Sequence, residues 1–104
     1  MGTLQDILLL IIGILAINSE TKYVKKRDVS EKIRELTGRN SQSFNVIIST
    51  SYKELYKKEL ISIRGNFVAL NKTGLVKARD IKKKIDTLYG KTDWSNIRAF
   101  YEKK

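Results

Sequence analysis

Hydrophobic residues are most concentrated near the start of the chain. Residues 7–17 are almost all apolar, with Asp6 before them and Asn18 after them. The consecutive aliphatic residues 8–12 make a helix here apolar around its whole circumference, as is typical of a helix buried on more than one side. The pattern predicts a buried helix that begins after a Thr3 cap and ends at about Asn18.

The length of this apolar run bears on where the protein resides. A membrane-spanning helix needs about 20 apolar residues, whereas residues 7–17 provide eleven. The start of the chain also lacks the basic segment and small-residue cleavage site of a signal peptide. We therefore expect a cytoplasmic protein with no membrane partner.

Two further helical segments follow, separated by a short polar turn. Apolar residues at three- and four-residue spacing predict a helix over residues 28–37, and Gly38 is suited to end it in a left-handed conformation. Asp28 or Ser30 is expected to cap the start of this helix. Glu31 is spaced to complete a capping box with Asp28.

The next helical pattern, residues 41–58, has two unlike faces. At about 100° per residue, the predicted buried stripe consists of Phe44, Ile47, Ile48, Ser51 and Leu55. The opposite face consists of Gln42, Val46, Ser49, Lys53 and Lys57, with Ser43, Thr50 and Asn45 at its edges. A merely solvated face is more often rich in paired Glu and Lys, whereas the first turns here are uncharged after Arg39. Short polar side chains favour close approach to a partner.

A β-hairpin is predicted over residues 60–70, where alternating apolar and polar residues flank Arg64-Gly65-Asn66. A short strand at residues 21–24 is expected to pair with this hairpin. Further helices are predicted over residues 75–89 and from about Asp93 onward. The predicted fold class is therefore mainly α with a small β-hairpin (α+β).

The chain shows no linker or internal repeat, and its 104 residues suit one domain. We expect a single domain over residues 1–104 that has three parts. These parts are an apolar N-terminal helix at residues 1–19, a central unit at residues 23–74 and C-terminal helices at residues 75–104.

The composition is strongly basic and lacks two reactive residue types. Lys and Arg number 21 against 11 Asp and Glu, a formal charge of +10, which favours phosphate backbones or anionic surfaces as partners. Cysteine and histidine are absent, which removes disulfides, zinc sites and histidine general bases. With no phosphate-binding glycine loop or apolar carboxylate pair, we expect no enzyme, catalytic residue, metal or cofactor. No small-molecule ligand can be inferred.

A series of short motifs runs through the central unit: Tyr23-Val24, Val29-Ser-Glu-Lys-Ile33, Leu36-Thr-Gly38, Ser43-Phe44, Tyr52-Lys-Glu-Leu55, Leu60-Ile61 and Phe67-Val-Ala-Leu-Asn-Lys-Thr-Gly74. With these motifs, residues 23–74 resemble the winged helix-turn-helix family of bacterial and archaeal DNA-binding regulators. The last motif is similar to the family's Leu-Thr-x-x-Gly start of the following helix, with Asn71 where Thr is usual. The resemblance implies a winged helix-turn-helix that places a recognition helix in the major groove of double-stranded DNA and a wing against the backbone or minor groove.

On this resemblance, the DNA-contacting residues are of two kinds. Residues of the first kind are expected to contact base edges: Gln42 and Asn45 to pair with adenine, Ser43 and Ser49 with several bases, and Val46 to touch the methyl group of thymine. Residues of the second kind are expected to contact phosphates: Lys25, Lys26, Arg27, Lys53 and Lys57. Arg39 is expected to contact guanine or phosphate, and Arg64 is expected to enter the minor groove. The predicted set is Lys25, Lys26, Arg27, Arg39, Asn40, Ser41, Gln42, Ser43, Asn45, Val46, Ser49, Lys53, Lys57, Arg64 and Asn66.

The flanking apolar helices are similar to the dimerising helices of small archaeal, plasmid-borne and viral regulators of this type. A domain of this size cannot easily bury an all-apolar helix with its remaining helices alone, whereas a second copy can. We therefore expect a homodimer; the alternative is that the C-terminal segment covers the helix within one monomer. The predicted interface is Leu8, Ile12, Leu15, Leu88, Trp94, Ile97, Phe100 and Tyr101.

The expected function is sequence-specific binding of double-stranded DNA by a dimeric, nucleoid-associated transcriptional regulator. The sequence leaves two alternatives open. One is a non-specific DNA-coating, architectural or partition protein, and the other is a winged helix that serves as a protein–protein interaction module. A peripheral membrane protein is disfavoured because the apolar helix has no polar face of its own.

Overall fold

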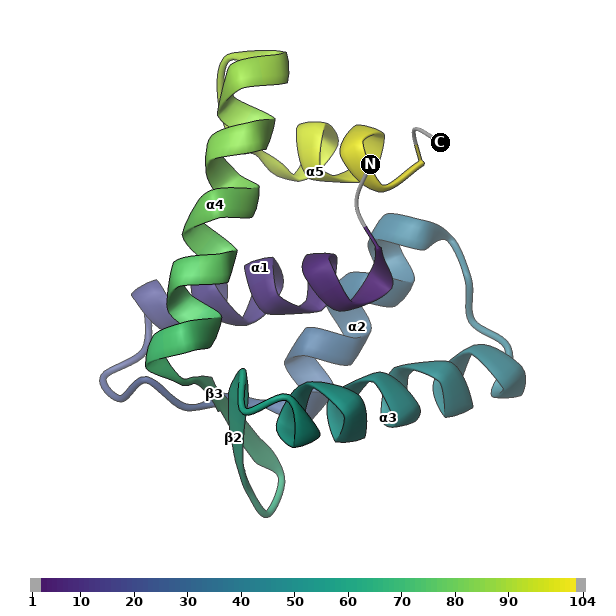
Figure 1. Cartoon of the computed structure of the whole chain (residues 1–104). Coiled ribbons are helices and arrows are strands. Elements are labelled where there is room, and N and C mark those ends of the chain that lie inside the picture. The colour runs from purple at the N-terminus through teal and green to yellow at the C-terminus, as the bar shows by residue number, and fades with distance from the viewer. Residues whose placement is uncertain (1–2, 103–104) are drawn as a thin grey trace.

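The computed structural model describes residues 3–102, which form five helices and a three-stranded antiparallel sheet. This α+β arrangement confirms the predicted fold class. Figure 1 shows α1 at the centre, α3 and the hairpin on one side, and α5 on the opposite side. The elements are α1 (Leu4–Ile17), β1 (Val24–Lys25), α2 (Lys26–Thr37), α3 (Gln42–Lys57), β2 (Ile61–Arg64), β3 (Phe67–Leu70), α4 (Lys72–Tyr89) and α5 (Trp94–Glu102).

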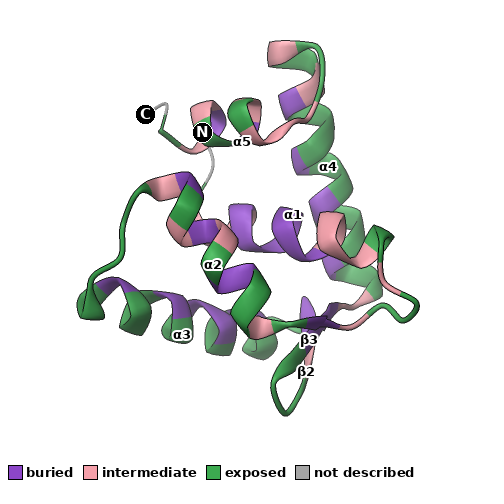
Figure 2. Ribbon diagram, turned by 180° about the vertical axis from the view of Figure 1, so that it is seen from behind, coloured by how far each residue is buried: buried purple, intermediate pink, exposed green. Residues whose placement is uncertain are grey.

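Helix α1 is the centre of the hydrophobic core. Its start is closed by a capping box, in which the Thr3 hydroxyl accepts from the Asp6 amide and the Asp6 carboxylate accepts from the Thr3 amide. Residues 7–12 are all buried, and α1 contacts each of the other four helices and the sheet (Figure 2). The predicted cap and buried helix are confirmed. Among residues 3–102, no helix is both long and apolar enough to cross a bilayer.

The burial of α1 within one chain corrects the expectation that a second copy must cover it. Leu8 and Ile12 of α1 are completely buried by the chain's own helices. Ile97 and Phe100 of α5 are also in this core, so the C-terminal helix helps to cover the apolar elements. These four predicted interface residues are therefore core residues. Leu15, Trp94 and Tyr101 are half-buried at the edge of the core, and Leu88 is exposed.

Helix α2 begins at Lys26, two residues before the predicted start, so the predicted cap at Asp28 or Ser30 and the capping box with Glu31 are wrong. Lys25, the last residue of β1, occupies the N-cap position, where its side chain cannot cap the helix because an ammonium group has no acceptor. The free Lys26 amide instead donates to the carbonyl of Asn66 in the hairpin, at 2.8 Å. A strand partner thus replaces the side-chain cap. At the other end, Gly38 has φ 68°, as predicted for a left-handed stop.

The sheet has the order β1-β3-β2, with both pairs antiparallel. Arg64 pairs with Phe67, which leaves Gly65 and Asn66 as the two-residue turn of the predicted hairpin. Gly65 has φ 60°, the positive φ that such turns require at their first central position. A strand before α2 pairs with the hairpin as predicted, through Val24 and Val68 of β3, but it covers Val24–Lys25 and not residues 21–24.

Helix α3 begins after Ser41, whose hydroxyl accepts from the Phe44 amide. Four of the five residues predicted in its buried stripe are buried, but Ile47 is 41% exposed. The buried arc is instead rotated toward Tyr52, which is 6% exposed and faces α2. The rotation follows from the hydrogen bonds of the Tyr52 hydroxyl, which periodicity alone does not report.

The hairpin is joined to α4 through a close backbone contact. The Asn71 amide donates to the Leu60 carbonyl at 3.0 Å, and the Asn71 side chain donates to the carbonyls of Glu59 and Ile61. Gly74, one turn into α4, is packed so closely on Leu60 that a Cβ there would overlap the Leu60 carbonyl. Because backbone cannot move aside as a flexible side chain can, this position requires glycine.

Two glycine-to-alanine substitutions test this packing. We expect Gly74→Ala to lower the free energy of unfolding by about 3 kcal/mol, as overpacking against rigid backbone does. Gly13→Ala is the matched control in α1, where a Cβ meets the flexible Cδ1 of Leu70 at 3.3 Å. We expect it to be neutral or to stabilise by up to about 1 kcal/mol through helix propensity. Urea unfolding measures both, and equal effects would contradict the contact.

Candidate nucleic-acid interface

The predicted outer face of α3 is open to solvent in the structure. Figure 2 shows this face as an exposed edge along the whole helix. Val46 is 61% exposed although it is apolar. Arg39 lies just before α3 with its guanidinium 4.3 Å from the centre of the Phe44 ring, so stacking directs it along the start of the helix. The exposed predicted residues of the turn and of α3 are Arg39, Asn40, Ser41, Gln42, Ser43, Asn45, Val46, Ser49, Lys53 and Lys57.

A hollow of about 370 Å³ lies where α2, α3 and β2 meet. Its polar residues come mainly from the facing sides of the two helices, and Ile63 of β2 closes one end. Four of its side chains are cations and none is a carboxylate. The lining residues are Lys26, Arg27, Ser30, Arg34, Asn45, Ile48, Ser49, Tyr52, Lys53 and Ile63.

A second hollow of about 330 Å³ adjoins the first, because both include Lys26 and Arg27. It is completed by Lys25 at the end of β1 and by Asn66 and Phe67 of the hairpin. The sequence-predicted cationic cluster before α2 is therefore brought beside the hairpin turn. Together the two hollows form one continuous basic surface, which we call the α2–α3 groove.

The α2–α3 groove contains seven of the predicted DNA-contacting residues and leaves the others outside. Its seven are Lys25, Lys26, Arg27, Asn45, Ser49, Lys53 and Asn66. Gln42 and Ser43 are the first two residues of α3, next to the turn from α2, and do not line the groove. The enclosed part of the face is therefore the middle of α3, because the hairpin and the start of α2 meet the helix there.

Arg64 lies beside the turn of the hairpin, as its sequence position suggested. It pairs with Phe67 at the end of β2, just before the turn. Its guanidinium lies 5.1 Å from the centre of the Tyr23 ring, on the β1 side of the sheet. Arg64 is therefore exposed on the hairpin but outside the α2–α3 groove.

Arg34 is a groove residue that the sequence analysis missed. Its Nε donates to the Oδ1 of Asn45 at 2.9 Å, which links the last turn of α2 to the first turn of α3. Arg27, Ser30 and Arg34 are spaced by three and four residues, so they share one face of α2. That spacing, opposite the apolar stripe of the helix, was the signal that would have found Arg34.

The groove is held in shape by the buried hydroxyl of Tyr52. This hydroxyl donates to the Lys26 carbonyl at 3.2 Å and also forms a 3.2 Å hydrogen bond with the Ser30 hydroxyl. Burial raises the pKa of Tyr52 above its ordinary value, although the Ser30 hydrogen bond and the charge of Arg34 oppose the shift. The neutral phenol thus fixes the first turns of α2 against α3.

Outside the groove, the described residues offer few groups for metal binding. Within residues 3–102, no group of three or more His, Cys, Asp and Glu side chains is placed to hold a metal ion. No protein-family model, curated protein or solved structure matches the chain. The function must therefore be argued from the geometry and charge of the groove.

Substituting the phenol tests how the groove is held. We expect Tyr52→Phe to lower the free energy of unfolding by about 1–3 kcal/mol, because the buried Ser30 and Lys26 groups lose a partner. Because its pKa is raised, the Tyr52 phenol is favoured in its protonated form in the folded protein. Its contribution to the free energy of unfolding is therefore complete below the ordinary pKa of 10.0 and is lost as the pH rises through the pKa of the folded state. Denaturant unfolding at pH 7 to 11 should show the wild-type advantage shrinking with pH.

The matched control is Tyr56→Phe, on the same helix. Tyr56 is 56% exposed, so removing its hydroxyl should change the unfolding free energy little at any pH. An advantage of wild type over Tyr52→Phe that stays constant up to pH 11 would contradict the buried-phenol assignment.

Proposed function

We propose that the chain is a winged helix-turn-helix protein that binds double-stranded DNA. In this proposal α3 enters the major groove and the β2–β3 hairpin is the wing. The order of helices and strands supports it, since α2 and α3 are joined by a short turn and followed directly by the hairpin. The observation that carries the proposal is the α2–α3 groove, whose first hollow has four cations and no carboxylate.

The residues of the groove divide between the two tasks of DNA binding. Lys25, Arg27 and Lys53 provide long cationic side chains suited to phosphates, which position a protein without reading sequence. Asn45 and Ser49 are short and lie between these cations on α3, where base edges would be reached. Exposed Val46 suits contact with a thymine methyl group.

The proposal predicts a salt-dependent interaction with duplex DNA. A dimer that neutralises about six to eight phosphates should show log K falling with log salt at a slope of about −5 to −7. Fluorescence anisotropy with the duplex upstream of its own gene and a scrambled duplex measures this slope. A preference of about 10³-fold or more marks a sequence-specific regulator, and equal binding marks a DNA-coating or partition protein.

A pair of charge-matched variants locates the interaction. Lys53→Gln removes a cation of the groove, and the slope should become shallower by about 0.9 for each bound copy. Lys77→Gln removes the same charge from the exposed face of α4, at a position that lines neither hollow of the groove, and should leave the slope nearly unchanged. Equal effects of the two variants would show that only overall charge matters. No binding by wild type at low salt would refute the DNA proposal.

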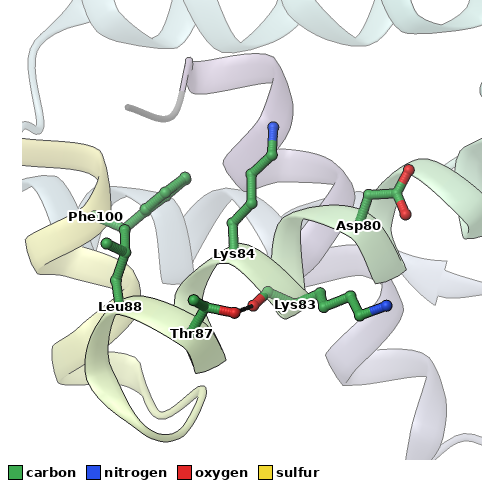
Figure 3. A pocket seen from close by; sticks show the side chains of 6 residues that line it. All are labelled: Asp80, Lys83, Lys84, Thr87, Leu88 and Phe100. Atoms are coloured by element: carbon green, nitrogen blue, oxygen red, sulfur yellow. Dashed lines mark hydrogen bonds between the residues drawn. The ribbon is translucent and has the colours of Figure 1, made fainter.

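We also propose that two copies of the chain associate, on a smaller surface than the sequence suggested. Leu88 of α4 is 56% exposed beside a hollow of about 600 Å³ that also involves Phe100 of α5 (Figure 3). Asp80 and Lys84 border this hollow, and within residues 3–102 neither forms an ion pair. In a contact with two-fold symmetry, the same surface of each copy faces the other copy. Asp80 of one copy can then pair with Lys84 of the other, and the reverse pair forms as well.

For one dimer to read two half-sites one turn of DNA apart, its two α3 helices would have to lie about 34–36 Å apart. We expect Leu88→Glu to convert the dimer to a monomer, because it buries a charge in the apolar contact. Val76→Glu is the control, since Val76 is 58% exposed on α4 but does not line this hollow. Light scattering at micromolar concentration measures both, and a monomeric wild type would refute the dimer.

One observation favours a second function. The neighbouring Val46 and Ile47 of α3 are 61% and 41% exposed, and adjacent exposed apolar residues suit a protein partner. A winged helix that binds protein through this face would bind neither duplex in the anisotropy experiment. The salt series therefore decides between the two functions.

A further inference from the structure

The hydrogen bond between Arg34 and Asn45 fixes how the Asn45 amide is turned. The Arg34 Nε is a donor only, so the Asn45 atom that it meets at 2.9 Å must be the amide oxygen. The Asn45 amide nitrogen, with its two N–H donors, is thus the end that is not engaged by Arg34. The expected pairing of Asn45 with adenine needs its oxygen as an acceptor, and one of the two lone pairs of that oxygen already accepts from a cation.

Two further acceptors of the same hollow are engaged as well, whereas the exposed Ser49 hydroxyl can either donate or accept. The hydroxyls of Ser30 and Tyr52 bond to each other, and Tyr52 also donates to the Lys26 carbonyl. No carboxylate lines the hollow. What remains for a partner is mainly N–H donors, from the outer nitrogens of Arg34, the amide nitrogen of Asn45 and the cations around them.

A donor-rich surface discriminates between base pairs by elementary chemistry. In the major groove guanine shows two neighbouring acceptors, N7 and O6, whereas adenine shows N7 beside an N6 donor and cytosine an N4 donor. If an N–H group of the protein faced the N6 amino group of adenine or the N4 amino group of cytosine, two donors would meet and both would lack an acceptor, which is energetically costly. The guanidinium of Arg34 matches the N7 and O6 pair in geometry as well as in charge.

We infer that Arg34 and Asn45 together form a guanine-reading element of this chain, with Arg34 as a specificity-determining residue. This inference rests on the proposed DNA-binding function. Arg34 is half-buried between α2 and α3 and is held by Asn45, so its outer nitrogens are pre-positioned at the groove. Each copy of the chain accordingly requires a guanine at one position of its half-site.

Selection from a pool of randomised duplexes tests the inference without altering the protein. We expect wild type to enrich guanine at one position of each half-site. Replacing that guanine by adenine, which exchanges the O6 acceptor for a donor, should weaken binding about 5- to 150-fold. Replacing it by 7-deazaguanine removes the N7 acceptor alone and should weaken binding less than adenine does.

Protein variants assign the preference to a residue. Arg34→Lys keeps the charge but loses the Nε donor and the planar fork. It should lose the guanine preference while retaining the salt slope and the binding of scrambled duplex. Arg79→Lys makes the same exchange at an exposed position of α4 outside the groove and should retain the guanine preference. Asn45→Ala, at an exposed position that does not threaten folding, should reduce the preference.

The outcomes separate this inference from the proposed function. If wild type binds no duplex at low salt, the proposed function fails and the inference fails with it. If duplex is bound but no guanine is enriched, or the preference survives in Arg34→Lys, the inference is overturned and DNA binding stands. An enriched adenine that depends on Asn45 would show that the amide oxygen is released on binding.

Discussion

The burial of one all-apolar helix is the constraint on which the rest of the structure depends. Because α1 has no polar face along residues 7–12, every side of it must be covered. The four other helices and the sheet supply that cover, so α1 determines where α2 and α4 sit. The basic α2–α3 groove is therefore built on the outside of a core whose shape is set by the first helix.

Much of the element order could be predicted from periodicity, because each element carries a local signal. Gly38 and Gly90 take the left-handed φ that ends a helix, and Asp93 caps the last helix through the Asn96 amide. Where prediction failed, a distant segment supplied the missing group. The start of α2 is satisfied by the hairpin carbonyl of Asn66, which no local pattern around Asp28 can reveal.

The candidate site was predictable only in part, because local signals identify its residues but distant contacts decide which of them lie together. The cations at residues 25–27 and the polar face of α3 are visible along the sequence, but which of them share a hollow is set by packing. Arg34 was missed because its role depends on contact with Asn45, eleven residues away on another helix. Four of the residues predicted for contact between copies lie in the core instead, because α5 packs with α1 in one core, which the sequence could not show.

The hydrogen bond from the Lys26 amide to the Asn66 carbonyl has a consequence for how the chain moves. It makes the turn of the hairpin part of the N-terminal closure of α2, so the hairpin cannot swing outward without exposing that amide to water. Local opening of this kind is what amide hydrogen exchange detects. The exchange rate at Lys26 is therefore a built-in reporter of hairpin displacement, readable in solution without any label.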